Sequence, residues 1–87
     1  MTPLHEAAWR GLGDVVTALV DKGAELDATD NTLRSPLMEA AARGHSGIVR
    51  LLLEAGANVW LRDAWGKTAE DIAREDENIH LVDFCID

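Results

Sequence analysis

Cysteine is nearly absent from this chain, since Cys85 is the single one and has no partner for a disulfide bond within the sequence. There is no apolar run of about 18 residues, which is the least that a membrane-spanning helix needs. The N-terminus also lacks the basic segment and apolar core of a signal peptide. We therefore expect an intracellular protein, of the cytoplasm or nucleus, that does not enter a membrane.

Positive charge is scarce as well. The 87 residues contain 8 Lys and Arg against 16 Asp and Glu, a formal net charge of −8. Residues 1–68 hold nine acids and seven bases, whereas residues 69–87 hold seven acids and one base. Nucleic acids and anionic membranes attract a positive field, so neither is an expected partner.

A chain of this length forms one small domain, residues 1–87, and has no room for a large internal pocket. Hydrophobic residues make up 47% of it and charged residues 28%, which is typical of a globular protein rather than a disordered one.

The most informative pattern is a repeat with an offset of 33 residues. TPLHEAA at 2–8 aligns with SPLMEAA at 35–41, and VVTAL at 15–19 aligns with IVRLL at 48–52. A partial third copy starts at the same offset, where Asp63 follows Asp30, Thr68 follows Ser35 and Ala73 follows Ala40. One register kept over this length indicates repeated structural units.

Each full copy predicts two short helices. Thr2 and Ser35 are helix N-cap residues, each followed by proline at the first helical position. Glycines 11 and 44 end these first helices, and glycines 23 and 56 end second helices whose apolar stripes are 15–19 and 48–52. Residues 24–34 and 57–67 lack helical periodicity and predict extended turns.

The period, the TPLHEAA segment, the following Gly-His and the closing Gly-Ala together resemble the ankyrin repeat. This resemblance implies an all-α solenoid of stacked helix-turn-helix pairs linked by β-hairpin-like loops. The repeats would be 1–29, which lacks its hairpin, 30–62, and 63–87, which serves as a C-terminal cap. It also implies a protein-binding role without catalysis.

Three features depart from this pattern. Leu33 stands where the family usually has glycine, as at Gly66, and a non-glycine residue at positive φ costs about 1 to 2 kcal/mol. We therefore expect a different turn before Ser35. In the third copy Glu70 replaces a core leucine, which suits a cap, residues 68–87, with a solvated outer face.

The third departure is at the other end of the chain. The first copy has no polar cap before it, so we expect apolar surface around Leu4 and Val15 to be open. Such an edge fits either a fragment of a longer array or self-association through the first repeat.

No catalytic or cofactor-binding motif occurs, and we expect neither an enzyme nor a cofactor. His5, His45 and His80 lie in different repeats without metal-ligand spacing, so local hydrogen bonds explain them better than a metal. The acidic run at 70–77 is interpreted as a solvated face.

Transferring the family's usual contact positions, the hairpin tips and the exposed end of the first helix, gives a candidate binding face. Its main members are basic or aromatic residues and polar residues of one hairpin: Trp9, Arg10, Asn31, Thr32, Arg34, Arg43, Arg62, Trp65 and Lys67. Ala42, Ala64, Glu75 and Asp76 complete the set. Arginine pairs with carboxylates and tryptophan fills apolar pockets, so we expect a protein or peptide with acidic and apolar residues.

Several alternatives stay open at this point. The arginines could simply make the face soluble, with the tryptophans lying flat on their own repeats. Trp60 could pack on the next repeat or stand exposed, and Trp60 or Trp9 could join Trp65 in an aromatic cage for methylated lysine. The whole segment could also be a structural cap of a longer array, with binding elsewhere, or a designed array, against which Leu33 and Trp60 argue.

Overall fold

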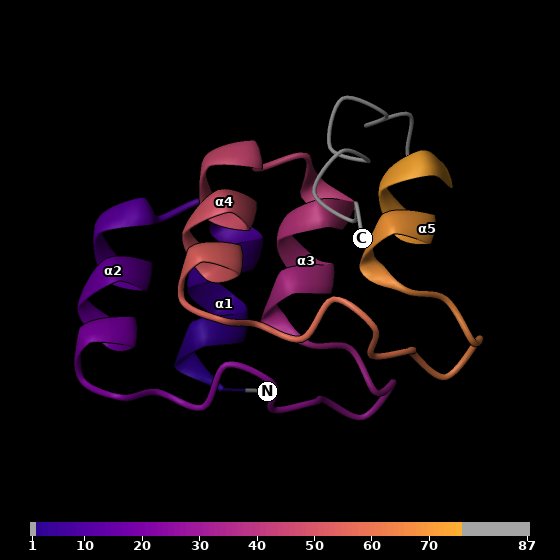
Figure 1. The fold of residues 1–87 in the computed structure, drawn as a ribbon, viewed down its shortest axis with the longest axis horizontal. Helices are drawn as coiled ribbons and strands as arrows, with labels where there is room; N and C mark the ends of the chain where they lie inside the picture. The colour runs from indigo at the N-terminus through magenta and orange to yellow at the C-terminus, as the bar shows by residue number, and fades with distance from the viewer. Residues whose placement is uncertain (1, 76–87) are drawn as a thin grey trace.

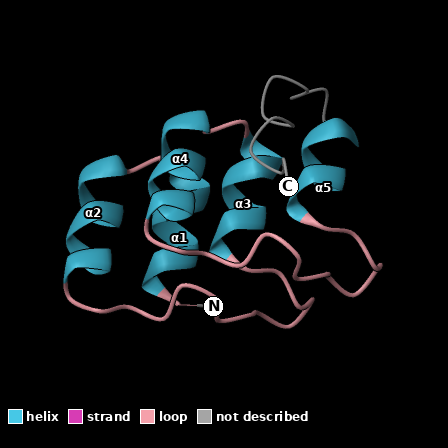
Figure 2. Cartoon of the chain, viewed as in Figure 1, coloured by secondary structure: helices cyan, strands magenta, loops and turns pink. Residues whose placement is uncertain are grey.

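The computed structural model describes residues 2–75, in which five helices form two layers (Figures 1 and 2). The inner layer contains α1 (Pro3–Arg10), α3 (Pro36–Arg43) and α5 (Ala69–Glu75), with α3 packed between the other two. The outer layer contains α2 (Gly13–Asp21), which packs on α1 and α4, and α4 (Ser46–Glu54), which packs on α3. In this part of the chain, no helix is long and apolar enough to cross a membrane.

The predictions for Asp76, Glu77, His80, Cys85 and the rest of the cap after residue 75 lie outside the described residues.

The predicted helix ends are confirmed. The Thr2 hydroxyl accepts a hydrogen bond from His5 N at 3.2 Å, and the Ser35 hydroxyl accepts one from Met38 N at 3.3 Å. Gly11 and Gly44 take the left-handed conformation directly after α1 and α3, with φ of 78° and 73°. These caps satisfy backbone groups that a helix of eight residues leaves unpaired.

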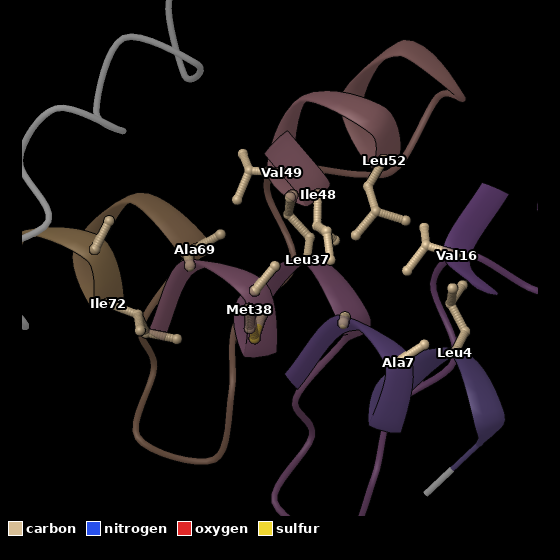
Figure 3. Packing of buried hydrophobic residues seen from close by; sticks show 14 residues of the cluster. Leu4, Ala7, Val16, Leu37, Met38, Ile48, Val49, Leu52, Ala69 and Ile72 are labelled. Carbon is tan, nitrogen blue, oxygen red and sulfur yellow. The ribbon is translucent and has the colours of Figure 1, made fainter. Parts of the chain in front are cut away.

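Small residues fill the core between the inner helices, where Ala7, Ala8, Ala40, Ala41 and Ala73 are all buried. A methyl side chain at each contact lets neighbouring helices approach closely. The space between the layers is filled by branched side chains, and Figure 3 shows them converging from four helices: Leu4, Val16, Leu37, Ile48, Val49 and Leu52.

The expected open apolar surface lies beside Leu4, in a mostly apolar pocket of about 200 Å³ lined by Thr2, Pro3, Leu4, Leu19, Ala24 and Glu25. The expectation does not hold for the Leu4 side chain itself, since Leu4 is only 1% exposed. Its side chain lies beside Val16 in the core, so the first repeat covers this leucine with its own second helix (Figure 3). Val15 is 44% exposed, as expected, whereas the equivalent Ile48 in the second repeat is only 4% exposed.

The two loops between repeats are hairpins without strand pairing, and the expectation of a different turn at Leu33 is wrong. Leu33 takes a φ of 63°, and its N–H donates to Asp30 O at 2.9 Å, as Gly66 N–H donates to Asp63 O. The Asp30 carboxylate accepts hydrogen bonds from Thr32 N and Arg34 N, each 2.9 Å. These bonds impose the turn on a residue that is unsuited to it.

His5 joins the first repeat to the hairpin of residues 30–34. The Thr2 N–H donates to His5 Nδ1, and His5 Nε2 lies 2.7 Å from the Arg34 carbonyl oxygen, to which it donates. Similarly, His45 Nε2 donates to Trp9 O at 3.0 Å. The hydrogen-bonding roles predicted for both histidines are confirmed.

Because Leu33 is strained, we expect Leu33→Gly to stabilise the protein by about 0.5 to 1 kcal/mol, which is the relief of strain less the chain entropy that glycine adds. Leu33→Ala keeps the strain and serves as the control. Urea unfolding of the three proteins measures the difference. A glycine variant less stable than the alanine variant would contradict a strained turn.

We expect His5→Met to lose about 1 to 3 kcal/mol, because a partly buried carbonyl and a helix cap each lose a partner. Methionine is the natural residue at the equivalent position 38, so its size is tolerated in this fold. His45→Met removes a single, more exposed hydrogen bond and should cost less. Equal losses in thermal or urea unfolding would show that His5 does not hold the hairpin.

Candidate functional site

The candidate binding residues lie on the side of the molecule formed by the inner helices and the two hairpins, residues 30–34 and 63–67. We call this side the inner face. Two pockets on this face are lined by candidate residues, and we name them by their order along the chain.

The first pocket lies where α1 faces α3 and has a volume of about 310 Å³. Its lining comprises Glu6, Trp9, Arg10 and Glu39. Arg10 is bound to Glu6 across one helical turn, with 2.8 Å between Nη2 and Oε2. The Arg43 guanidinium lies over the Trp9 ring, 4.4 Å from its centre, in a cation–π contact.

The second pocket lies between the hairpins and α5 and has a volume of about 270 Å³. It is lined by two cationic, two acidic and two apolar residues: Arg34, Lys67, Asp63, Glu75, Trp65 and Ile72. Asp63 accepts hydrogen bonds from Trp65 N and Lys67 N, each 2.9 Å, which fixes the hairpin that carries the exposed Trp65 ring. Lys67 Nζ lies 2.6 Å from Glu75 Oε1, and this hydrogen bond raises the pKa of Lys67.

Arg34 separates the two pockets. Its Nη1 donates to Glu39 Oε1 at 3.5 Å, and its Nε lies 3.9 Å from Asp63 Oδ2. Nε is buried and has no hydrogen-bond partner. Both contacts are longer than the 2.7 to 2.9 Å of a strong charge-assisted hydrogen bond. Arg34 is thus divided between two carboxylates and holds neither tightly.

Two carboxyl groups near Arg34 differ in their pKa. Burial raises the pKa of Glu39, and the attraction of Arg34 offsets this only in part. Burial also acts to raise the pKa of Asp30, but the hydrogen bonds from Arg34 N and from Thr32 outweigh it and leave that pKa lowered. The native structure therefore disfavours the charge of Glu39 and favours that of Asp30.

The pockets bring together most of the predicted residues. Trp9 and Arg10 line the first pocket with Arg43 beside them, and Arg34, Trp65 and Lys67 line the second. Asn31, Thr32 and Arg62 line neither. Thr32 O accepts a hydrogen bond from Ala64 N at 2.8 Å, which links the hairpins, and Arg62 Nη1 donates to Gly66 O at 2.9 Å.

Trp60 stands exposed, at 64%, on the loop after α4 and lines neither pocket. Each pocket contains one tryptophan, so neither assembles the aromatic cage considered from the sequence.

Sequence reasoning missed Glu6, Glu39, Asp63 and Ile72 as lining residues. Glu6, Glu39 and Ile72 occupy equivalent positions in the three repeats, 33 residues apart. In the third repeat this position holds the buried Ile72. An apolar residue at an equivalent position was an available signal that Glu39 is buried. The same missed acids pair with the predicted cations, so the inner face is less positive than its arginines indicate.

Within residues 2–75, no group of three or more His, Cys, Asp or Glu residues is arranged to hold a metal ion.

Helix pairs that recur every 33 residues, joined by hairpins that project from the same side, define a solenoid of helix-turn-helix repeats. A family model described as ankyrin repeats (3 copies) matches residues 1–63. The chain therefore belongs to the ankyrin repeat family, whose members are generally non-catalytic modules for protein–protein interaction. The search of curated proteins gave no match.

The opposite pKa shifts of Glu39 and Asp30 predict opposite pH dependences. Glu39 keeps its proton in the native state at a pH where the unfolded chain has released it. Its contribution to stability is therefore greatest below its ordinary pKa of 4.5 and is lost as pH rises through the raised value. Glu39→Gln should gain stability relative to the wild type as pH rises from about 4 to 7.

Asp30→Asn is the matched comparison. The advantage of the wild type over this variant should be full above the ordinary pKa of 3.8 and should shrink as pH falls through the lowered value. Urea unfolding across this pH range measures both differences. Parallel pH dependences for the two variants would contradict the assignment of these environments.

Proposed function

We propose that this chain is a protein–protein interaction module that binds a partner segment on its inner face. It would form one domain of three repeats, 1–29, 30–62 and 63–87, and act as part of a larger adaptor, scaffold or regulatory protein in the cytoplasm or nucleus. Nucleic acid, membrane and cofactors have no place in this proposal.

The observation that carries the proposal is the second pocket. It combines the exposed Trp65 ring and the Ile72 side chain with the cationic groups of Arg34 and Lys67. Tryptophan and arginine are enriched among the residues that dominate binding energy at interfaces. A pocket of this composition suits an apolar side chain next to a carboxylate, which supports the partner chemistry expected from the sequence.

Charge pairing within the pocket limits what an acidic partner gains. Lys67 is already bound to Glu75, and Arg34 is shared between Glu39 and Asp63. A carboxylate of the partner therefore competes with internal acids, and the apolar contact with Trp65 supplies most of the affinity.

A selection of peptides from a proteome-wide display library tests this proposal. The wild type should enrich peptides with acidic and apolar residues, and Trp65→Ala should weaken their binding by at least about tenfold. Trp60→Ala is the matched control, because Trp60 and Trp65 are equally exposed, at 64% and 65%. Equal losses for both variants, or none for either, would contradict binding at the second pocket.

Glu75→Gln provides a test in the opposite direction. It frees Lys67 from its ion pair, so binding of an acidic peptide should strengthen by up to about fivefold, the range for an exposed pair. Isothermal titration of one selected peptide measures the change. Arg34→Ala is a poorer probe, because it leaves the buried Glu39 and Asp63 without their cation.

A structural role in a longer array, with self-association through the first repeat, is the alternative. Leu12 and Val15 are exposed at 43% and 44%, whereas Ile48, which corresponds to Val15, is buried. Concentration-dependent association in sedimentation velocity that Val15→Glu abolishes, together with no selected peptide, would favour this role.

A further inference from the structure

Glu39 is a nearly buried carboxylate without a full set of hydrogen-bond partners. The residue is 4% exposed, and its Oε1 accepts one long hydrogen bond, 3.5 Å, from Arg34. Among residues 2–75, no donor is found for Oε2 of Glu39, and this oxygen is not one of the fully buried atoms without a partner, so it is accessible from outside. A buried carboxylate is normally paired by several donors, because its removal from water is costly.

The neighbouring cations do not supply what Glu39 lacks. Arg34 is shared with Asp63 and lies on the side of the second pocket. Arg10 is bound to Glu6 at 2.8 Å, and the Arg43 guanidinium lies over the ring of Trp9. Each guanidinium has its own contact, and Glu39 keeps one acceptor oxygen for a group from outside.

The first pocket gives such a group access to Glu39. Glu39 and Glu6 are two of its lining residues, and Trp9 provides an apolar wall. A volume of about 310 Å³ is at the lower end of the range for ligand sites, which suits one long side chain. The raised pKa of Glu39 agrees with this geometry, since burial disfavours the charged carboxylate and the attraction of Arg34 offsets this only in part.

We infer that the first pocket binds a basic side chain of the partner, whose cationic nitrogen donates to Glu39 while its aliphatic stem packs on Trp9. Lysine and arginine both have such a stem and head. This inference rests on the proposed function, because the partner supplies the side chain. Since Arg34 and Glu39 are in contact between the two pockets, the partner carries its basic residue close to its acidic and apolar ones.

The inference differs from the aromatic cage considered for methylated lysine. The pocket has one tryptophan, and its acceptor is a carboxylate that needs a hydrogen-bond donor. A trimethylated lysine has no N–H to donate and should bind more weakly than an unmodified one.

The test uses single amino-acid derivatives and therefore does not need the natural partner. We would record the indole N–H signals of ¹⁵N-labelled protein during titration with N-acetyl-lysine amide. The neutral control is N-acetyl-norleucine amide, which keeps the apolar stem and lacks the cation. A saturable shift of the Trp9 signal should appear at an affinity at least about tenfold tighter for the lysine derivative.

Glu39→Gln should reduce the affinity for the lysine derivative to that of the norleucine derivative, while Glu54→Gln, at the exposed end of α4 and in neither pocket, should leave it unchanged. Glutamine keeps the size of Glu39 and an acceptor for Arg34, and unfolding curves of the variant establish that it folds. Equal affinities for the two derivatives would overturn the inference. Preferential binding of N-acetyl-glutamate amide at Trp9, or a response of Trp65 alone, would also overturn it.

These outcomes are separable from those of the proposed function. Selected peptides that depend on Trp65 without any lysine response at Trp9 would leave the interaction module standing and remove the basic subsite. A lysine response without selected peptides would establish the subsite and count against peptide recognition at the second pocket.

Discussion

Alanine side chains fill the contacts among α1, α3 and α5, and the rest of the molecule depends on this close packing. A helix pair of this size cannot bury its apolar residues alone, so each repeat is stable only against a neighbour. The packing also fixes a register in which residues 33 positions apart lie on one surface. Glu6 and Glu39 share a pocket for this reason, and so do residues of the two hairpins and α5.

Because of this register, residues at equivalent positions of different repeats can be compared directly. Glu39 takes a place that Ile72 occupies as a core residue in the third repeat, and it brings a charge into a nearly buried site. His5 takes a place held by Met38 in the second repeat and uses it to bind the Arg34 carbonyl. The inner face acquires its chemistry from substitutions at positions whose geometry the scaffold has already set.

Features encoded within a few residues could be predicted from the sequence. Thr2, Ser35 and their prolines predicted the starts of α1 and α3, and Gly11 and Gly44 predicted the ends. Leu33 was the exception, because propensity alone ignores the hydrogen bonds by which Asp30 imposes the turn. The burial of Leu4 likewise depended on the placement of α2, which no local signal gives.

The candidate site was predictable in outline and not in its electrostatics. The repeat register placed Trp9, Arg34 and Trp65 on one face, and the structure has them at two neighbouring pockets. The pairs of Arg34 with Glu39 and of Lys67 with Glu75 join different repeats and depend on side-chain conformations that a register does not specify. A face with its charges paired in this way favours discrimination among partners more than raw affinity.

The three tryptophans provide a direct test of the central claim, that a partner binds on the inner face. Trp9 and Trp65 each line a pocket of that face, whereas Trp60 is as accessible as Trp65 and lines neither. The measurement is the indole N–H spectrum of ¹⁵N-labelled protein, recorded with and without a peptide selected for binding. We predict that the signals of Trp9 and Trp65 shift while that of Trp60 stays in place. A shift confined to Trp60 would place the partner elsewhere and contradict it.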